Sequence, residues 1–180
     1  MMFCWVASRA QKPPLNLHPY IGAGYYLGAN VSPNQESFIW GDSYQLGLIK
    51  DLPKGHQIGA GIGVQRAQRE TYFPITAHLK LVPSSNKTLG FIVAFGYSSA
   101  YGEYEEDDVN LEHYGGFYTE MGVRWFYEMD SGLRIKPQIS FSRQLSKVEY
   151  DRLDQPEIYI EQNRLALHVG ITVELRKREK

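Results

Sequence analysis

Residues Gln57 to Gln68 read QIGAGIGVQRAQ, and this stretch decides the fold. Alternate residues from Ile58 to Val64 are apolar, and the positions between them are glycine. Successive side chains of a β-strand point to opposite faces, so the stretch predicts a strand with one apolar face and one almost bare face. A bare face suits the inside of a narrow, strongly curved barrel, where there is little room for side chains. The apolar face then points outward, into lipid.

The same alternation recurs along the chain. It predicts strands at about 20–30, 43–52, 57–68, 71–82, 88–100, 114–128, 133–145 and 163–176. No segment shows a helical period, and no apolar run approaches the roughly 18 residues that a transmembrane helix requires. The sequence therefore predicts an all-β protein, an eight-stranded antiparallel up-and-down transmembrane β-barrel.

The expected connections differ in length in a regular way. Short turns are predicted at 52–55, 83–87 and 129–132, and long loops at 31–42, 101–113 and 146–161. The connection after the third strand, at Arg69–Glu70, is also short although it falls at the long-loop end. Alternate connections of an up-and-down barrel lie at opposite ends, so the short turns share one end with both termini. Short periplasmic turns and longer external loops are typical of outer-membrane barrels. We therefore expect the loops outside and both termini in the periplasm.

Two stretches carry a resemblance to a known family. They are YIGAGY at Tyr20–Tyr25 and LALHVGI at Leu165–Ile171. Over residues 18–176 the chain resembles the small eight-stranded bacterial outer-membrane β-barrels of the OmpA/OmpX type. This resemblance implies an outer membrane of a Gram-negative bacterium, contact with its lipid and lipopolysaccharide, and insertion by the barrel assembly machinery. Residues 1–17 are interpreted as a signal-peptide remnant and extended lead-in, and residues 177–180 as a basic tail.

The outward register is expected to face lipid. Its members in the strand centres are Ile58, Ile62, Val64, Val93, Phe95, Val123, Ile139, Leu167, Val169 and Ile171. An alternative is a soluble lipocalin-like barrel that binds a small apolar ligand. That alternative requires this apolar set to point inward and Glu120, Arg124 and Arg134 to point into water.

The inward register carries ionisable residues. They are His78, Lys80, Glu120, Arg124, Arg134, Lys136, His168 and Glu174. The interior of an eight-stranded barrel is only wide enough for side chains to fill it, and isolated charges there are costly. We therefore predict a salt-bridge network that plugs the lumen. A small polar ligand or an ion path is the functional alternative.

Catalysis is not predicted. A lipid A-modifying barrel enzyme, the other alternative, needs a polar dyad on the lipid side, and Ser140, Ser142 and His168 fall on the inward register instead. A nucleophile also needs a base within hydrogen-bond reach and an oxyanion site. The sequence thus favours a non-enzymatic protein whose external loops serve surface interaction or membrane integrity, with an unidentified loop partner.

The charge of the chain and the placement of its charged residues bear on three further classes of ligand: nucleic acid, metal ions and lipopolysaccharide. The net charge of −1 argues against nucleic acid as a partner. The acidic loop at 101–113 is interpreted as a solvated tip, because its spacing fits no calcium-binding loop, so neither metal nor cofactor is predicted. Arg66 and Arg143 lie on the outward register near the long-loop end, where they are expected to contact lipopolysaccharide phosphates.

Overall fold

The computed structural model describes residues 17–32, 35–67, 70–83, 88–102, 110–129, 131, 133–152 and 155–175. Most of the expected lead-in, the basic tail and the acidic residues 103–108 lie outside these ranges. The strands are β1 Leu17–Ser32, β2 Gln35–Asp51, β3 Gln57–Ala67, β4 Glu70–Leu81, β5 Leu89–Gly102, β6 Asn110–Tyr114, β7 Gly116–Trp125, β8 Tyr127–Glu128, β9 Leu133–Arg152 and β10 Gln155–Leu175. Among the described residues, no helix is long and apolar enough to cross a membrane.

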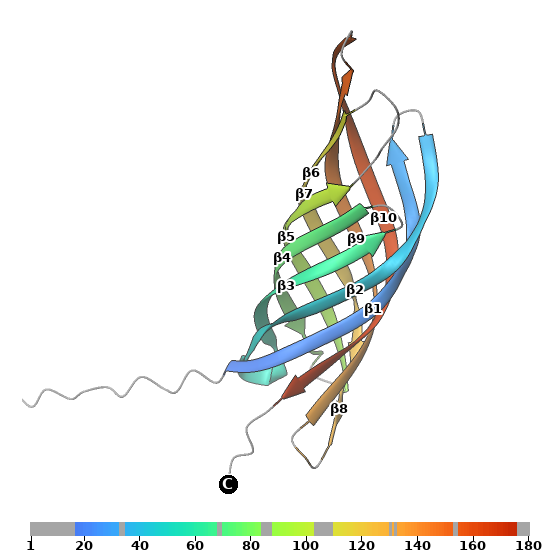
Figure 1. The fold of residues 1–180 in the computed structure, drawn as a ribbon. Coiled ribbons are helices and arrows are strands. Elements are labelled where there is room, and N and C mark those ends of the chain that lie inside the picture. Colours follow the sequence, from blue (N-terminus) through green and yellow to red (C-terminus); the bar gives the residue numbers. More distant parts are fainter. Residues whose placement is uncertain are drawn as a thin grey trace, which may run out of the picture.

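The strands close into a barrel (Figure 1). Neighbours in sequence pair antiparallel around the wall, and β10 pairs with both β9 and β1 to complete the ring. The short segments β6 and β8 each pair with β9 and add no position to the ring. The predicted all-β, eight-stranded antiparallel barrel is therefore confirmed.

Two hairpins are longer than the sequence pattern predicts. β2 begins at Gln35 and pairs with β1 as far as Ser32, so the loop expected at 31–42 is mostly strand. β9 and β10 likewise pair up to Arg152 and Gln155, so the loop expected at 146–161 is mostly strand. Its apolar residues Val148, Tyr150, Ile158 and Ile160 prolong the hairpin, which their alternation had allowed. Pairing satisfies the backbone N–H and C=O groups of these segments, which a polar loop would leave to water. Both hairpins rise beyond β3 and β4 (Figure 1).

The expected sixth strand is divided into pieces. β6 falls mostly within the loop expected at 101–113 and lies against β9, and β7 begins only after Gly115. A second break at Phe126 separates β7 from β8, and the Phe126 N–H donates to the Thr88 carbonyl at 2.8 Å. At this break the Phe126 ring lies beneath the Lys80 ammonium.

The glycines of β2 and β3 make room for a ring from β1. Tyr20, Gly47 and Gly61 pair in one row across the three strands. A Cβ added at Gly47 or Gly61 would collide with the Tyr20 ring or its hydroxyl. The same ring then meets the His78 imidazole edge to face, with centroids 5.3 Å apart. The bare face predicted for β3 is thus inside the barrel, where it is covered by side chains from other strands.

Candidate functional site

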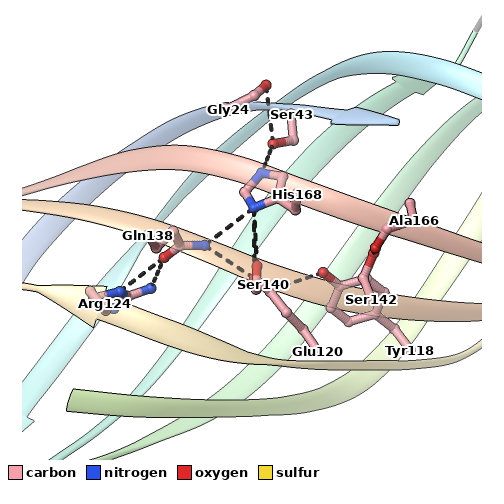
Figure 2. A network of polar contacts seen from close by, with 10 residues as sticks. All are labelled: Gly24, Ser43, Tyr118, Glu120, Arg124, Gln138, Ser140, Ser142, Ala166 and His168. Atoms are coloured by element: carbon pink, nitrogen blue, oxygen red, sulfur yellow. Dashed lines mark hydrogen bonds and ion pairs between the residues drawn. The ribbon is translucent and has the colours of Figure 1, made fainter. Parts of the chain in front are cut away.

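The centre of the lumen holds a hydrogen-bond network built on β7 and β9 (Figure 2). Arg124 Nε donates to Gln138 Oε1 at 2.9 Å, and a second guanidinium nitrogen contacts the same oxygen. The Gln138 amide nitrogen donates to Glu120 Oε1 at 3.1 Å. Glu120 also accepts from the Tyr118 hydroxyl at 2.8 Å and from Ser140. Arg124 and Glu120 are therefore joined through an amide rather than directly.

This network fixes the proton position on His168. Arg124 offers only donors, so the Gln138 oxygen must face it and the Gln138 NH₂ must face the other way. That NH₂ lies 3.2 Å from His168 Nδ1, which therefore accepts. The proton then sits on Nε2, which donates to Ser43 Oγ at 2.7 Å. Ser43 in turn lies 3.4 Å from the Gly24 carbonyl (Figure 2).

Ser43 and His168 are placed like the nucleophile and base of a hydrolase, but their hydrogen bond has the wrong direction for that role. A serine nucleophile must donate its proton to the histidine, whereas here the histidine donates to Ser43. His168 Nδ1 and Glu120 Oε1 are 3.7 Å apart, too far for a hydrogen bond that would orient the ring. The hydroxyl of Ser142 donates to the Ala166 carbonyl at 3.3 Å. These contacts describe a packed polar interior.

A second polar cluster lies nearer the ends of β9 and β10. Lys136 and Glu174 form an ion pair, and both side chains are fully buried. Lys136 also donates to Gln57 Oε1 at 3.0 Å, which ties β9 to β3 across the lumen. Arg134 lies 4.0 Å from Glu174 and 2.7 Å from Glu128. The charges of this cluster are thus balanced by close partners, as a buried position requires.

The interior differs from the expected chain of salt bridges beyond the amide bridge between Arg124 and Glu120. Lys80 Nζ lies 3.3 Å from the centroid of the Phe126 ring, a cation–π contact. His78 packs against Tyr20. Sequence reasoning also gave no role to Gln138, although the inward register placed it beside the charged residues. An amide bridge leaves no sequence signal beyond that alternation.

A further buried cation, Arg164, was not predicted at all. Arg164 on β10 is 4 % exposed, and its guanidinium lies between two rings, 4.4 Å from that of Tyr26 and 4.6 Å from that of Tyr72. Stacking on aromatic faces suits the weakly hydrated guanidinium. The hydroxyl of Tyr72 donates to Glu70 at 2.8 Å. Together these side chains fill the lumen on the long-hairpin side of Glu120.

One group of side chains has the composition of a metal site. His18, Asp51 and Glu174 each bring a ligand atom within 4.8 Å of the other two. Glu174 already pairs with Lys136 and lies 4.0 Å from Arg134. Because Lys136 and Arg134 already lie close to the Glu174 carboxylate, their positive charges would repel a metal ion. The group is therefore better explained as part of the second polar cluster.

The outer face of the barrel is apolar and exposed. Of the residues expected to face lipid, those exposed by 43 to 53 % are Ile58, Ile62, Val93, Phe95, Ile139, Leu167, Val169 and Ile171. Val64 and Val123 are half-buried against their neighbours. By contrast, Lys80, Glu120, Arg124, Lys136 and Glu174 are 0 to 7 % exposed. The wall thus separates an apolar exterior from a charged interior.

The two outward arginines both have partners within the chain. Arg66 Nη2 lies 2.7 Å from Asp42, and its guanidinium lies 5.5 Å from the Tyr44 ring centroid. Arg143 Nε donates to Asn163 Oδ1 at 2.9 Å. The side chain of Arg66 remains 59 % exposed in its pair.

The closed wall, its charged filling and its apolar exterior define a small β-barrel of the outer-membrane type. No protein-family model matches the chain, and no curated protein matches it in sequence. Solved structures match its fold. Outer membrane protein AlkL, solved in lipid bilayers, has a TM-score of 0.58 at 11 % identity over 95 % of this chain and 96 % of that chain. OprG from Pseudomonas aeruginosa has a TM-score of 0.50 at 8 % identity, over 89 % and 96 %.

Proposed function

We propose that the protein is an integral barrel of a bacterial outer membrane. The observation that carries this proposal is the apolar exterior, which runs around the wall as a continuous set of exposed residues. Soluble monomers rarely expose contiguous apolar patches beyond a few hundred Å². The lipocalin-like alternative needs the opposite arrangement, and the exposed Ile58 and Ile62 and the buried Arg124 argue against it.

The orientation follows from the strand lengths. A transmembrane strand needs about 9–11 residues, and β3 has 11 whereas β9 has 20 and β10 has 21. The surplus projects on the side away from the short turns and the barrel's termini. Projecting segments are external in outer-membrane barrels, so the long hairpins lie outside and the termini lie in the periplasm.

The role is structural and surface-directed rather than enzymatic or conductive. The central network, the second polar cluster and Arg164 fill the lumen in succession, which supports a plugged barrel. The projecting hairpins then provide the surface that meets external partners or supports the membrane. Arg66 contacts lipopolysaccharide phosphate while it keeps its Asp42 pair, and Arg143 on β9 adds a second contact on the opposite side of the barrel.

Orientation and location are tested together by cysteine labelling on whole cells. Cys4 is first replaced in a Cys4→Ser background, and single cysteines are introduced as Glu161→Cys on β10 and Lys54→Cys in the short turn. A membrane-impermeant maleimide should label Glu161→Cys on intact cells, and Lys54→Cys only after the outer membrane is permeabilised. Labelling of both on intact cells contradicts the orientation, and recovery of the chain without detergent contradicts membrane residence.

The plug is tested by electrical recording. The purified full chain, refolded in detergent and inserted into planar bilayers, should give no stepwise conductance. An open lumen would give regular steps from every inserted molecule. A gel that compares boiled and unboiled samples confirms that the inserted material is folded.

A further inference from the structure

A pocket opens at the end of the barrel that carries the short turns. Its volume is 790 Å³, within the range of about 300–1,000 Å³ that small-molecule sites occupy. The walls come from the end of β2, the turn after it, the end of β4 and the break between β7 and β8. Apolar surface comes from Leu52, Val82, Pro83 and Phe126. Two of its lining residues, Arg134 and Glu128, belong to the second polar cluster, whereas none of the lining residues that the structure describes belongs to the central network.

The charges that line the pocket are unequal. Three cations, Lys54, Lys80 and Arg134, face two carboxylates, Asp51 and Glu128. Both carboxylates are engaged: Asp51 accepts from Gln57 at 2.6 Å, and Glu128 pairs with Arg134 at 2.7 Å. Among the described residues, no carboxylate pairs with Lys54 or Lys80. The pocket therefore has a surplus of positive charge.

Lys80 is the buried member of this surplus. It is 4 % exposed, and its ammonium rests on the Phe126 ring 3.3 Å from the centroid. An aromatic face attracts the charge but accepts no conventional hydrogen bond, and no residue that the structure describes accepts one from this ammonium. Buried cations are normally both paired and hydrogen-bonded, so this one calls for an anionic acceptor.

We propose that the pocket binds a small organic anion, an oxyanion carried on an apolar body. The oxyanion accepts hydrogen bonds from Lys80 at the back of the pocket and from Lys54 at its rim. The apolar body packs on Phe126, Val82 and Leu52. The site is independent of the membrane orientation proposed above, because it depends only on the geometry of this end of the barrel.

The chemistry of the pocket argues against a cation as occupant. A metal ion would meet Lys80 and Arg134, and the carboxylates within reach are already paired. A neutral apolar ligand would fill the volume and leave Lys80 without an acceptor. A bare inorganic anion would satisfy Lys80 and leave the apolar surface uncovered. An organic anion is the class of ligand that both accepts hydrogen bonds from Lys80 and covers the apolar surface of the pocket.

Phenyl phosphate is a suitable probe because it combines the two features and is freely soluble. The full chain, labelled with ¹⁵N and refolded in a neutral detergent, is titrated with phenyl phosphate, inorganic phosphate or benzyl alcohol. Amide shifts at Gly55 and Thr88 report on the pocket. Phenyl phosphate should shift these amides and saturate, and the other two probes should bind more weakly.

The variants isolate the contribution of charge. Lys80→Met keeps the side-chain length and removes one charge-assisted hydrogen bond, which predicts an affinity loss of about 10- to 150-fold. Lys54→Met changes an exposed side chain in the turn after β2 and should lower affinity several-fold. Lys50→Met, an exposed lysine at the same end and outside the pocket lining, is the matched control and should leave affinity unchanged.

Several outcomes overturn the proposal. Equal affinity for phenyl phosphate and benzyl alcohol would show that the pocket reads apolar surface alone. Unchanged affinity in both Lys80→Met and Lys54→Met would show that the cations are not contacts. A competition experiment with micelles that contain an anionic phospholipid distinguishes the source of the anion. If the phospholipid displaces phenyl phosphate from the natural chain but not from Lys80→Met, the site binds a lipid headgroup. That result would overturn the proposal of a soluble ligand.

Discussion

The pair Lys136–Glu174 offers the sharpest test of the buried interior. Both side chains are fully buried, so removing one charge leaves the other without adequate compensation. Breaking such a pair costs about 3–5 kcal/mol of unfolding free energy. The two single changes should differ, because Glu174 keeps Arg134 at 4.0 Å when Lys136 is lost. Glu174→Gln leaves Lys136 with neutral amide oxygens, that of Gln57 among them, in place of its carboxylate partner.

We therefore expect Lys136→Met to cost about 3 kcal/mol and Glu174→Gln about 4–5 kcal/mol. The double variant carries no buried charge at this position and should lie within about 1 kcal/mol of the natural chain. A double-mutant cycle then gives a coupling energy of at least about 6 kcal/mol, far beyond the roughly 0.5 kcal/mol within which independent sites add.

The assay is reversible urea unfolding in lipid vesicles, followed by tryptophan fluorescence. With a slope of about 2 kcal/mol per molar, the single variants should lower the midpoint by about 1.5–2.5 M. Glu128→Gln is the matched control, because Glu128 pairs with Arg134 but its side chain is 56 % exposed. An exposed pair is worth at most about 1 kcal/mol. Single variants that unfold like the control, or additive costs in the double variant, would refute the reasoning.

Three further predictions address the wall and the central network. Gly61→Ala should cost about 1–3 kcal/mol by urea unfolding, because its Cβ collides with the Tyr20 hydroxyl, while Ala60→Val on the outer face should change stability by less than 0.5 kcal/mol. Ile62→Arg should cost about 2–4 kcal/mol in vesicles, and a negligible cost would contradict burial of the outer face in lipid. Nitrogen NMR of His168 should show the proton on Nε2; a proton on Nδ1 would reopen the question of a catalytic base.

The barrel is predictable from the sequence because alternation has a physical cause at every strand. The glycine stretch at Gln57–Gln68 and the apolar residues of β10 each assign one face outward, and a closed ring is the arrangement that satisfies all of them. Strand ends are less predictable. Pro33, Asn34 and Gly41 indicate a loop, yet Gly41 pairs with Ala67 inside β2 because the Tyr26 ring needs the space above it.

The inward positions were also predictable, but their contacts were not. Alternation places Glu120, Arg124 and Lys136 inside, and the structure has them there. Which of them touch depends on the stagger between strands, which sets Arg124 opposite Gln138 and Glu120 opposite Ser142. The pocket beneath Lys80 depends on the break at Phe126, and no sequence pattern marks that break.

The row of Tyr20, Gly47 and Gly61 has a consequence for assembly. A register shift of two residues keeps every apolar side chain on the outer face, so the alternation of apolar and polar residues alone does not prevent such a shift. A slide of β2 against β1 moves Gly47 from beneath the phenol and brings Gln45 or Ile49 there instead. The Tyr20 ring then collides with a side chain in place of the space above Gly47, and this collision destabilises the hairpin in the shifted register. The fit of the Tyr20 ring over Gly47 and Gly61 thus favours one strand register among those that place the apolar side chains in lipid.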